Sequence, residues 1–252
     1  MKQSIFLFII IIFNYSSFSQ SLQHEIGVFG ISTSIQSDYK ERTNDLVAPY
    51  RNVGYGGGIS YYISIKQEKT HWNSKTSLFE NHLKLKLEAL YIQNEFSHRG
   101  NSIHDLENPT ESAKMYAMNG STKIYNFGGQ LEYYIIDLSK KSKINPFLSI
   151  GLHYVFFDAD IESDLGDIEE NPNYIPNEYL HGSLFLNKDK TQSFSIGVGA
   201  NYLINNSLTF GFDLSGQRFL SDKVDGLSPK TGYNKYRDWM TAVQLGAIIK
   251  IN

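Results

Sequence analysis

The sequence predicts an all-β protein: an eight-stranded antiparallel up-and-down transmembrane β-barrel with long external loops. Three observations predict this fold: an N-terminal export pattern, repeated alternation of apolar with small or polar residues, and connections that alternate between long and short. The composition agrees, because the 252 residues include 17 Tyr and 16 Phe against 6 Pro, and aromatic residues favour strands. The alternating segments are 25–34, 53–65, 81–94, 122–137, 144–157, 193–203, 207–219 and 238–251.

Residues 1–19 have the pattern of a signal peptide. Lys2 gives a positive start, residues 5–13 are an unbroken apolar run, and Ser17 and Ser19 are small residues of the kind that signal peptidase recognises. We expect cleavage after Ser19, which leaves 20–252 as a single outer-membrane β-barrel domain. The apolar run is too short to cross about 30 Å of hydrocarbon as a helix. An exported chain without a longer apolar segment can span a membrane only with strands.

Each segment has one face of large apolar side chains and one face of small or polar side chains, since side chains alternate along a strand. Ile59 and Val198 belong to the apolar faces of their segments, and Gly58 and Gly197 to the small faces. Small residues suit the crowded interior of a narrow barrel, and the apolar face then suits lipid. Five aromatic residues are expected near the lipid–water interfaces: Tyr61, Tyr133, Tyr154, Tyr202 and Trp239. The alternation alone does not distinguish these from core aromatics of a soluble barrel.

Segment 81–94 also fits a helix, because Leu, Lys, Glu and Ala favour helices. Five consecutive apolar residues at every second position, from Leu83 to Tyr91, nevertheless favour a strand. The sequence also leaves room for a short helix at 109–118, within a loop.

The connections between successive segments contain 18, 15, 27, 6, 35, 3 and 18 residues. Outer-membrane barrels have short periplasmic turns and long external loops. If both termini are periplasmic, the connections of 18, 27, 35 and 18 residues face outward. The 15-residue second connection, 66–80, is longer than this rule expects.

Four short strings, at 24–28, 120–123, 130–134 and 146–154, resemble an uncharacterised flavobacterial outer-membrane β-barrel family. The layout is also similar to porin-family barrels of the outer-membrane protein X type. The resemblance covers essentially the whole mature chain and implies a location in the cell outer membrane, without a catalytic role. The chain departs from such barrels in ending on Asn252, where they often end on an aromatic residue that the insertion machinery recognises. We expect outer-membrane lipid, lipopolysaccharide and the barrel-assembly machinery as partners. We expect no nucleic acid, because the net charge is −3.

The sequence contains no motif of a nucleotide-binding, metalloprotease or serine-hydrolase site, and no enzyme activity or cofactor is expected. The Gly-rich string 54–58 has Ile59 where a dinucleotide-binding loop needs its last Gly, and no helix pattern follows it. Of the seven His residues, His153 on a predicted inward face is the best candidate for a catalytic base. A barrel-embedded lipid hydrolase or acyltransferase therefore stays open as an alternative, as does a secreted lipocalin-like binder of apolar ligands.

The stretch 158–178 is strongly acidic and contains no Lys or Arg. Its acidic residues are Asp158, Asp160, Glu162, Asp164, Asp167, Glu169, Glu170 and Glu178. The spacing loosely matches a calcium-binding loop, although Ser163 replaces the Gly that such a loop needs. We expect a solvated acidic loop, and whether it holds a divalent cation near lipopolysaccharide phosphates is left open.

The predicted lumen contains four charged residues and one glutamine on two neighbouring strands. They are Lys84, Lys86, Glu88, Gln130 and Glu132. We expect a Lys–Glu hydrogen-bonded network, because unpaired buried charges are costly. An eight-stranded barrel is filled by its side chains, so no open pore is expected.

Overall fold

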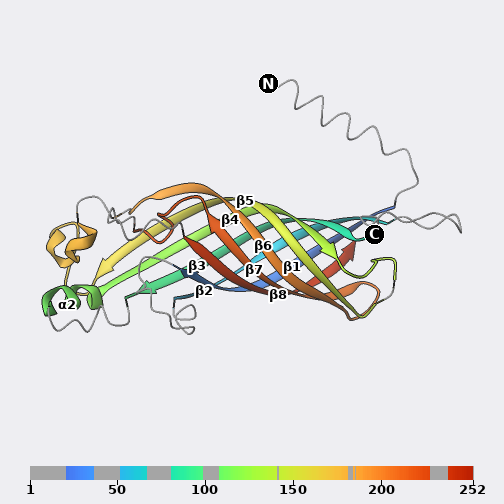
Figure 1. Ribbon diagram of the computed structural model, residues 1–252, viewed down its shortest axis with the longest axis horizontal. Helices are drawn as coiled ribbons and strands as arrows, with labels where there is room; N and C mark the ends of the chain where they lie inside the picture. The colour runs from blue at the N-terminus through green and yellow to red at the C-terminus, as the bar shows by residue number, and fades with distance from the viewer. Residues whose placement is uncertain are drawn as a thin grey trace, which may run out of the picture.

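The computed structural model describes residues 21–36, 52–66, 81–98, 108–140, 142–180, 184, 186–227 and 238–251. Within them, eight strands form a closed barrel in which each strand pairs antiparallel with the next, and β1 pairs with β8 (Figure 1). This confirms the predicted eight-stranded antiparallel up-and-down fold. The predicted signal peptide lies outside the described residues and stays a prediction.

The strands are β1 (Ser21–Gln36), β2 (Val53–Lys66), β3 (Leu83–Ser97), β4 (Met118–Tyr134), β5 (Ile144–Ser163), β6 (Lys188–Leu203), β7 (Leu208–Phe219) and β8 (Trp239–Ile251). Helix α2 (Pro109–Ala117) precedes β4, at the place where the sequence left room for a short helix. Two short 3₁₀ helices, η3 (Pro172–Tyr174) and η4 (Asn177–Tyr179), follow β5. No helix in the described part of the chain is long and apolar enough to cross a membrane.

The two ends of the barrel differ in their connections. The turn end carries the connections 135–143 and 204–207 together with the C-terminus, and the loop end carries α2, η3 and η4. Figure 1 shows α2 at one end of the barrel and the C-terminus at the other.

Three strands extend further toward the loop end than the alternation predicts. Strand β4 begins at Met118, β5 continues to Ser163 and β6 begins at Lys188. The first acidic residues of 158–178 therefore lie on a strand, and the prediction of a loop from residue 158 is wrong. The error arises because the outward residues of this part of β5 are polar, so that the sequence here resembles a loop.

The large apolar side chains point away from the barrel axis. Ile59, Val198 and Leu245 are exposed over 60%, 48% and 47% of their surface, whereas Ser60 and Ser195 are buried. These apolar residues form a belt around the turn-end part of the barrel, which we call the apolar belt. Its members include Ile26, Val28, Ile59, Leu85, Leu87, Leu131, Leu148, Ile150, Leu152, Val198, Phe212, Leu214 and Leu245. All five predicted interface aromatics also lie on the outer face.

The interior changes character along the barrel axis. Toward the turn end it is polar, with Lys86, Glu88, Gln130 and Glu132 among its buried residues. Toward the loop end it is a continuous apolar cluster. That cluster, here called the loop-end core, includes Ile31, Ile35, Leu90, Ile92, Phe96, Met118, Ile124, Val155, Phe157, Ile161, Phe219 and Met240. Side chains from the connections, Ile175, Tyr179, Val224 and Leu227, complete this core.

Glycines make room for large side chains inside the narrow barrel. A Cβ at Gly128 would collide with the ring of His153, and a Cβ at Gly246 would lie 2.5 Å from the ring of Phe29. Phe29 packs with Tyr62 and Ile248 in a second small apolar cluster. Ile248 is a large apolar residue on the inward face of β8, where the other segments carry mostly small or polar residues. It fills lumen space that neighbouring glycines leave.

Candidate functional site

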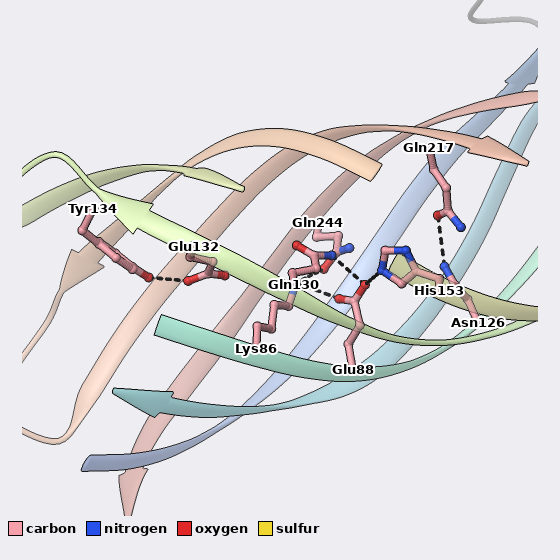
Figure 2. A network of polar contacts seen from close by, with 9 residues as sticks. All are labelled: Lys86, Glu88, Asn126, Gln130, Glu132, Tyr134, His153, Gln217 and Gln244. Carbon is pink, nitrogen blue, oxygen red and sulfur yellow. Dashed lines mark hydrogen bonds and ion pairs between the residues drawn. The ribbon is translucent and has the colours of Figure 1, made fainter. Parts of the chain in front are cut away.

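The most concentrated chemistry of the molecule is a polar network inside the barrel (Figure 2). Its centre is an ion pair between Lys86 Nζ and Glu88 Oε2, 2.8 Å apart, and both side chains are only 1% exposed. Lys86 also donates to Gln244 Oε1 on β8 at 3.2 Å. Because each of these groups is removed from water, their mutual contacts replace the hydration that burial removes.

Glu88 connects three strands. Its Oε1 accepts a hydrogen bond from Gln130 Nε2 on β4 at 2.7 Å and lies 2.9 Å from His153 Nε2 on β5. Further toward the loop end, Asn126 donates to Gln217 Oε1 on β7 at 3.0 Å. The network therefore links strands that are far apart around the sheet, across the inside of the barrel.

The predicted Lys–Glu network is confirmed in part. Lys86 pairs with Glu88 as expected, but Lys84 pairs with Glu25 on β1, at 2.6 Å. Glu132 accepts its hydrogen bond from the hydroxyl of Tyr134, at 2.6 Å, rather than from a lysine. Sequence reasoning missed Glu25, although its place on the same side of β1 as Gly27 indicates an inward direction.

His153 lies in the lumen, as its alternation predicts, with a side chain 1% exposed. Its Nε2 faces Glu88, while its Nδ1 has no hydrogen-bond partner. A serine nucleophile would need to lie within hydrogen-bond reach of this ring. No serine hydroxyl in the described part of the chain is hydrogen-bonded to His153. The geometry therefore suits a group that joins β5 to β3 rather than a catalytic base.

Two of the hollows lined by described residues lie toward opposite ends of the barrel. At the turn end, the mouth of the barrel holds a cavity of about 320 Å³, which is lined in part by Lys84, Glu25, Asn201 and Lys250. Toward the loop end, a groove of about 640 Å³ lies against β2 to β5, with Tyr55, Gln93, Glu95, Asp160 and Glu162 among its lining residues. Neither hollow leads through the barrel, since the polar network and the loop-end core lie between the two ends.

The acidic residues of β5 do not form a metal site. Asp158, Asp160 and Glu162 alternate along the outer face of the strand, which spaces neighbouring ones about 7 Å apart. Among the described residues, no group of three or more His, Asp or Glu side chains could hold a metal ion. The comparison with a calcium-binding loop fails because the first half of that stretch, residues 158–163, is extended strand.

The connections at the loop end are tied into a structured cap, formed by α2 and residues 164–180. Glu111 on α2 accepts hydrogen bonds from Asn177 N at 2.7 Å and from Lys114 Nζ at 2.9 Å. Burial alone would raise the pKa of Glu111, but these two donors hold it below its usual value. Below the cap, the ring of His98 lies tilted against the ring of Tyr179, with 5.5 Å between their centroids, and burial lowers the pKa of His98 to about 4.

Comparisons with known proteins add neither a family nor a site. No family model matches the chain, and no curated protein matches it. Among solved structures, it is similar to Neisserial surface protein A, with 10% identity and a TM-score of 0.47 over 92% of this chain and 99% of that chain. It is also similar to a major outer membrane protein from Thermus thermophilus, with 13% identity and a TM-score of 0.45 over 90% and 99% of the two chains. The outer membrane enzyme PagL has 12% identity and a TM-score of 0.37 over 89% and 99%. The fold is therefore argued from the strand pairing of this chain, and the resemblance to a flavobacterial family stays a prediction.

Proposed function

We propose that the protein is a non-conducting barrel of the outer membrane that presents its cap at the cell surface as a binding platform. The observation that carries this proposal is the apolar belt. A soluble barrel would place such side chains in its core and leave polar ones in water. Here the belt is outside and the ion pairs are inside, the arrangement suited to a lipid surrounding.

The height of the apolar belt fits a membrane. On β5, every outward side chain from Leu148 to Phe156 is apolar and exposed, and Asp158 follows at once. These nine residues match the 9–11 that a tilted transmembrane strand needs, and the same strand then continues beyond the lipid. The long connections lie at that end, which supports assigning it to the cell surface.

The filled lumen supports a role without conduction. An ion crossing the barrel would pass the buried Lys86–Glu88 pair and then the loop-end core, where Phe157 and Phe219 are almost completely buried. An apolar constriction of this kind excludes hydrated ions. Among the described residues, the side chains that fill the lumen favour this role over the lipocalin-like alternative, which needs an internal cavity for an apolar ligand.

The cap is the part of the protein suited to binding. Loops held by a rigid scaffold are where binding residues concentrate. Tyr116 of α2 is 70% exposed, and Leu165 is also exposed at the tip. Hydrogen bonds from Asn177 to Glu111 fix α2 against the segment after β5, so these side chains are presented in an ordered arrangement.

Fractionation and gel mobility test the proposal. Expressed with its leader, the protein should sediment with the outer membrane, resist carbonate extraction and run at a different gel mobility before and after boiling. Planar bilayers with the refolded protein should show no large, stable conductance. Recovery in the soluble fraction without detergent would overturn the membrane assignment, and a stable open channel would overturn the sealed lumen.

A further inference from the structure

A group of cations lies on the outer face just above the apolar belt, on one side of the barrel. It consists of Lys188 and Lys190 on β6 and Arg218 on β7, all exposed, and we call it the basic rim. The adjoining side, on β3 to β5, is more acidic: it carries Glu95, Asp158, Asp160 and Glu162, with one exposed cation, Lys123, which is paired in register with Asp158. The rim of the barrel is therefore polarised around its circumference.

The strand register places two of these cations beside outward apolar residues of the neighbouring strands. Lys190 is paired with Phe156 of β5, and Arg218 is paired with Phe194 of β6. Both phenylalanines are exposed on the outer face, at the loop-end border of the apolar belt. The cations thus begin in the row of residues where the apolar surface ends. In a membrane, this is the level at which lipid headgroups start.

Among the described residues, the basic rim is only weakly neutralised. Lys188 lies 3.6 Å from Asp158, but the two side chains are 84% and 39% exposed, and such surface pairs are weak. Arg218 stacks over the ring of Trp239, at 5.6 Å from its centroid, which leaves the edge of its guanidinium available to an anion. Lys190 forms no ion pair within the described part of the chain.

We propose that the basic rim binds the phosphate groups of anionic lipid in the outer leaflet, and that the acidic side of the barrel does not. This inference rests on the proposed function, which sets the apolar belt in the membrane. Long Lys and Arg side chains can keep their stems on apolar surface while their charged ends reach the headgroups. Arg218 supplies a planar donor group for phosphate, and the two lysines supply point charges. The carboxylates on β3 to β5 repel the same phosphates, so one side of the barrel orders anionic lipid.

The test compares the unfolding temperature of the protein in phosphatidylcholine vesicles with and without bisphosphorylated lipid A. The heat-dependent gel shift measures the unfolding. Lipid A should raise the unfolding temperature of the parent protein by about 5 °C, an effect that weakens in high salt. The triple variant Lys188→Gln, Lys190→Gln, Arg218→Gln should lose most of that rise. A matched variant with three lysines changed at the turn end, Lys140→Gln, Lys143→Gln, Lys250→Gln, should keep it. Inorganic phosphate with phosphatidylcholine alone should produce no rise, which separates a lipid from a free anion.

Each contrary result has a distinct meaning. An unchanged rise in the triple variant, or equal loss in the turn-end variant, would overturn the basic rim as the binding surface. A rise produced by inorganic phosphate alone would overturn lipid as the ligand. Failure of the parent protein to insert into either vesicle would instead overturn the proposed function.

Discussion

The two halves of the barrel have opposite arrangements of polar and apolar side chains, and a single strand shows both. In the turn-end part of β5, every second side chain from Leu148 to Phe156 faces outward, and Ser149 and His153 lie on the inner face. Toward the loop end of the same strand, Asp160 faces outward and Phe157 and Ile161 lie inside. Hydrogen bonding of the backbone continues without interruption through the change. The reversal is thus carried by the side chains and not by the backbone, and in the proposed membrane placement it marks the border between lipid and water.

The largest effect is expected from breaking the buried ion pair of the turn-end half. Lys86→Met leaves Glu88 without its ammonium partner in a site from which water is excluded. The loss should lower the free energy of unfolding by about 3–5 kcal/mol. Urea titration of the refolded protein in vesicles measures it, with Lys140→Met, at the exposed turn end, as the control. Equal effects of the two substitutions would show that the Lys86–Glu88 pair is not buried in the folded protein.

Truncation in the loop-end core should be nearly as costly. Phe157→Ala removes an almost fully buried ring and should cost about 3–5 kcal/mol, in the same titration. The matched change is at the neighbouring residue: Phe156→Ala alters a ring that is 44% exposed at the border of the apolar belt, and should cost clearly less. A reversed order would mean that the two faces of this strand are assigned the wrong way round.

The same charge introduced on the outer face should have different effects in the two halves. Ile150→Arg places a cation within the apolar belt and should cost about 2–4 kcal/mol in a bilayer. Ser121→Arg lies outward in the loop-end half, paired with Glu95 on one side and Asp160 on the other, and should change stability by less than about 1 kcal/mol. Urea midpoints in vesicles compare them, and similar losses at both positions would contradict a change of solvent between them.

The smallest effect is expected at acid pH, where protonation of His98 should destabilise the cap. Burial lowers the pKa of His98 to about 4, from about 6.5 in an unfolded chain. The unfolded state therefore binds a proton that the folded state does not between these pH values, so stability is full above pH about 6.5 and falls as the pH drops toward 4. Hydrogen exchange of residues 172–180 should increase over that range. His98→Phe should reduce this response, and an unchanged response would exclude His98 as its source.

The sequence could predict the turn-end half of the barrel, with its apolar belt, more fully than the loop-end half. Large apolar residues opposite glycines and serines mark the apolar belt clearly, so the eight strands, the outward aromatics and the inward Lys86 and Glu88 follow from alternation. The extensions of β4 to β6 could not be recognised, because polar outward residues beside a modest apolar set resemble a loop. Partners across the lumen, such as Glu25 for Lys84, depend on the stagger of distant strands, which alternation does not specify.

The most direct test of the account is to measure the solvent around β5 residue by residue. The chain contains no Cys, so a single cysteine can be placed at each outward position from Leu148 to Glu162 and given a nitroxide label. Electron paramagnetic resonance in vesicles then compares collisions with oxygen, which concentrates in lipid, and with a water-soluble nickel chelate. The account predicts oxygen-accessible labels through position 156 and nickel-accessible labels from position 158 onward. Nickel accessibility along the entire strand would contradict it.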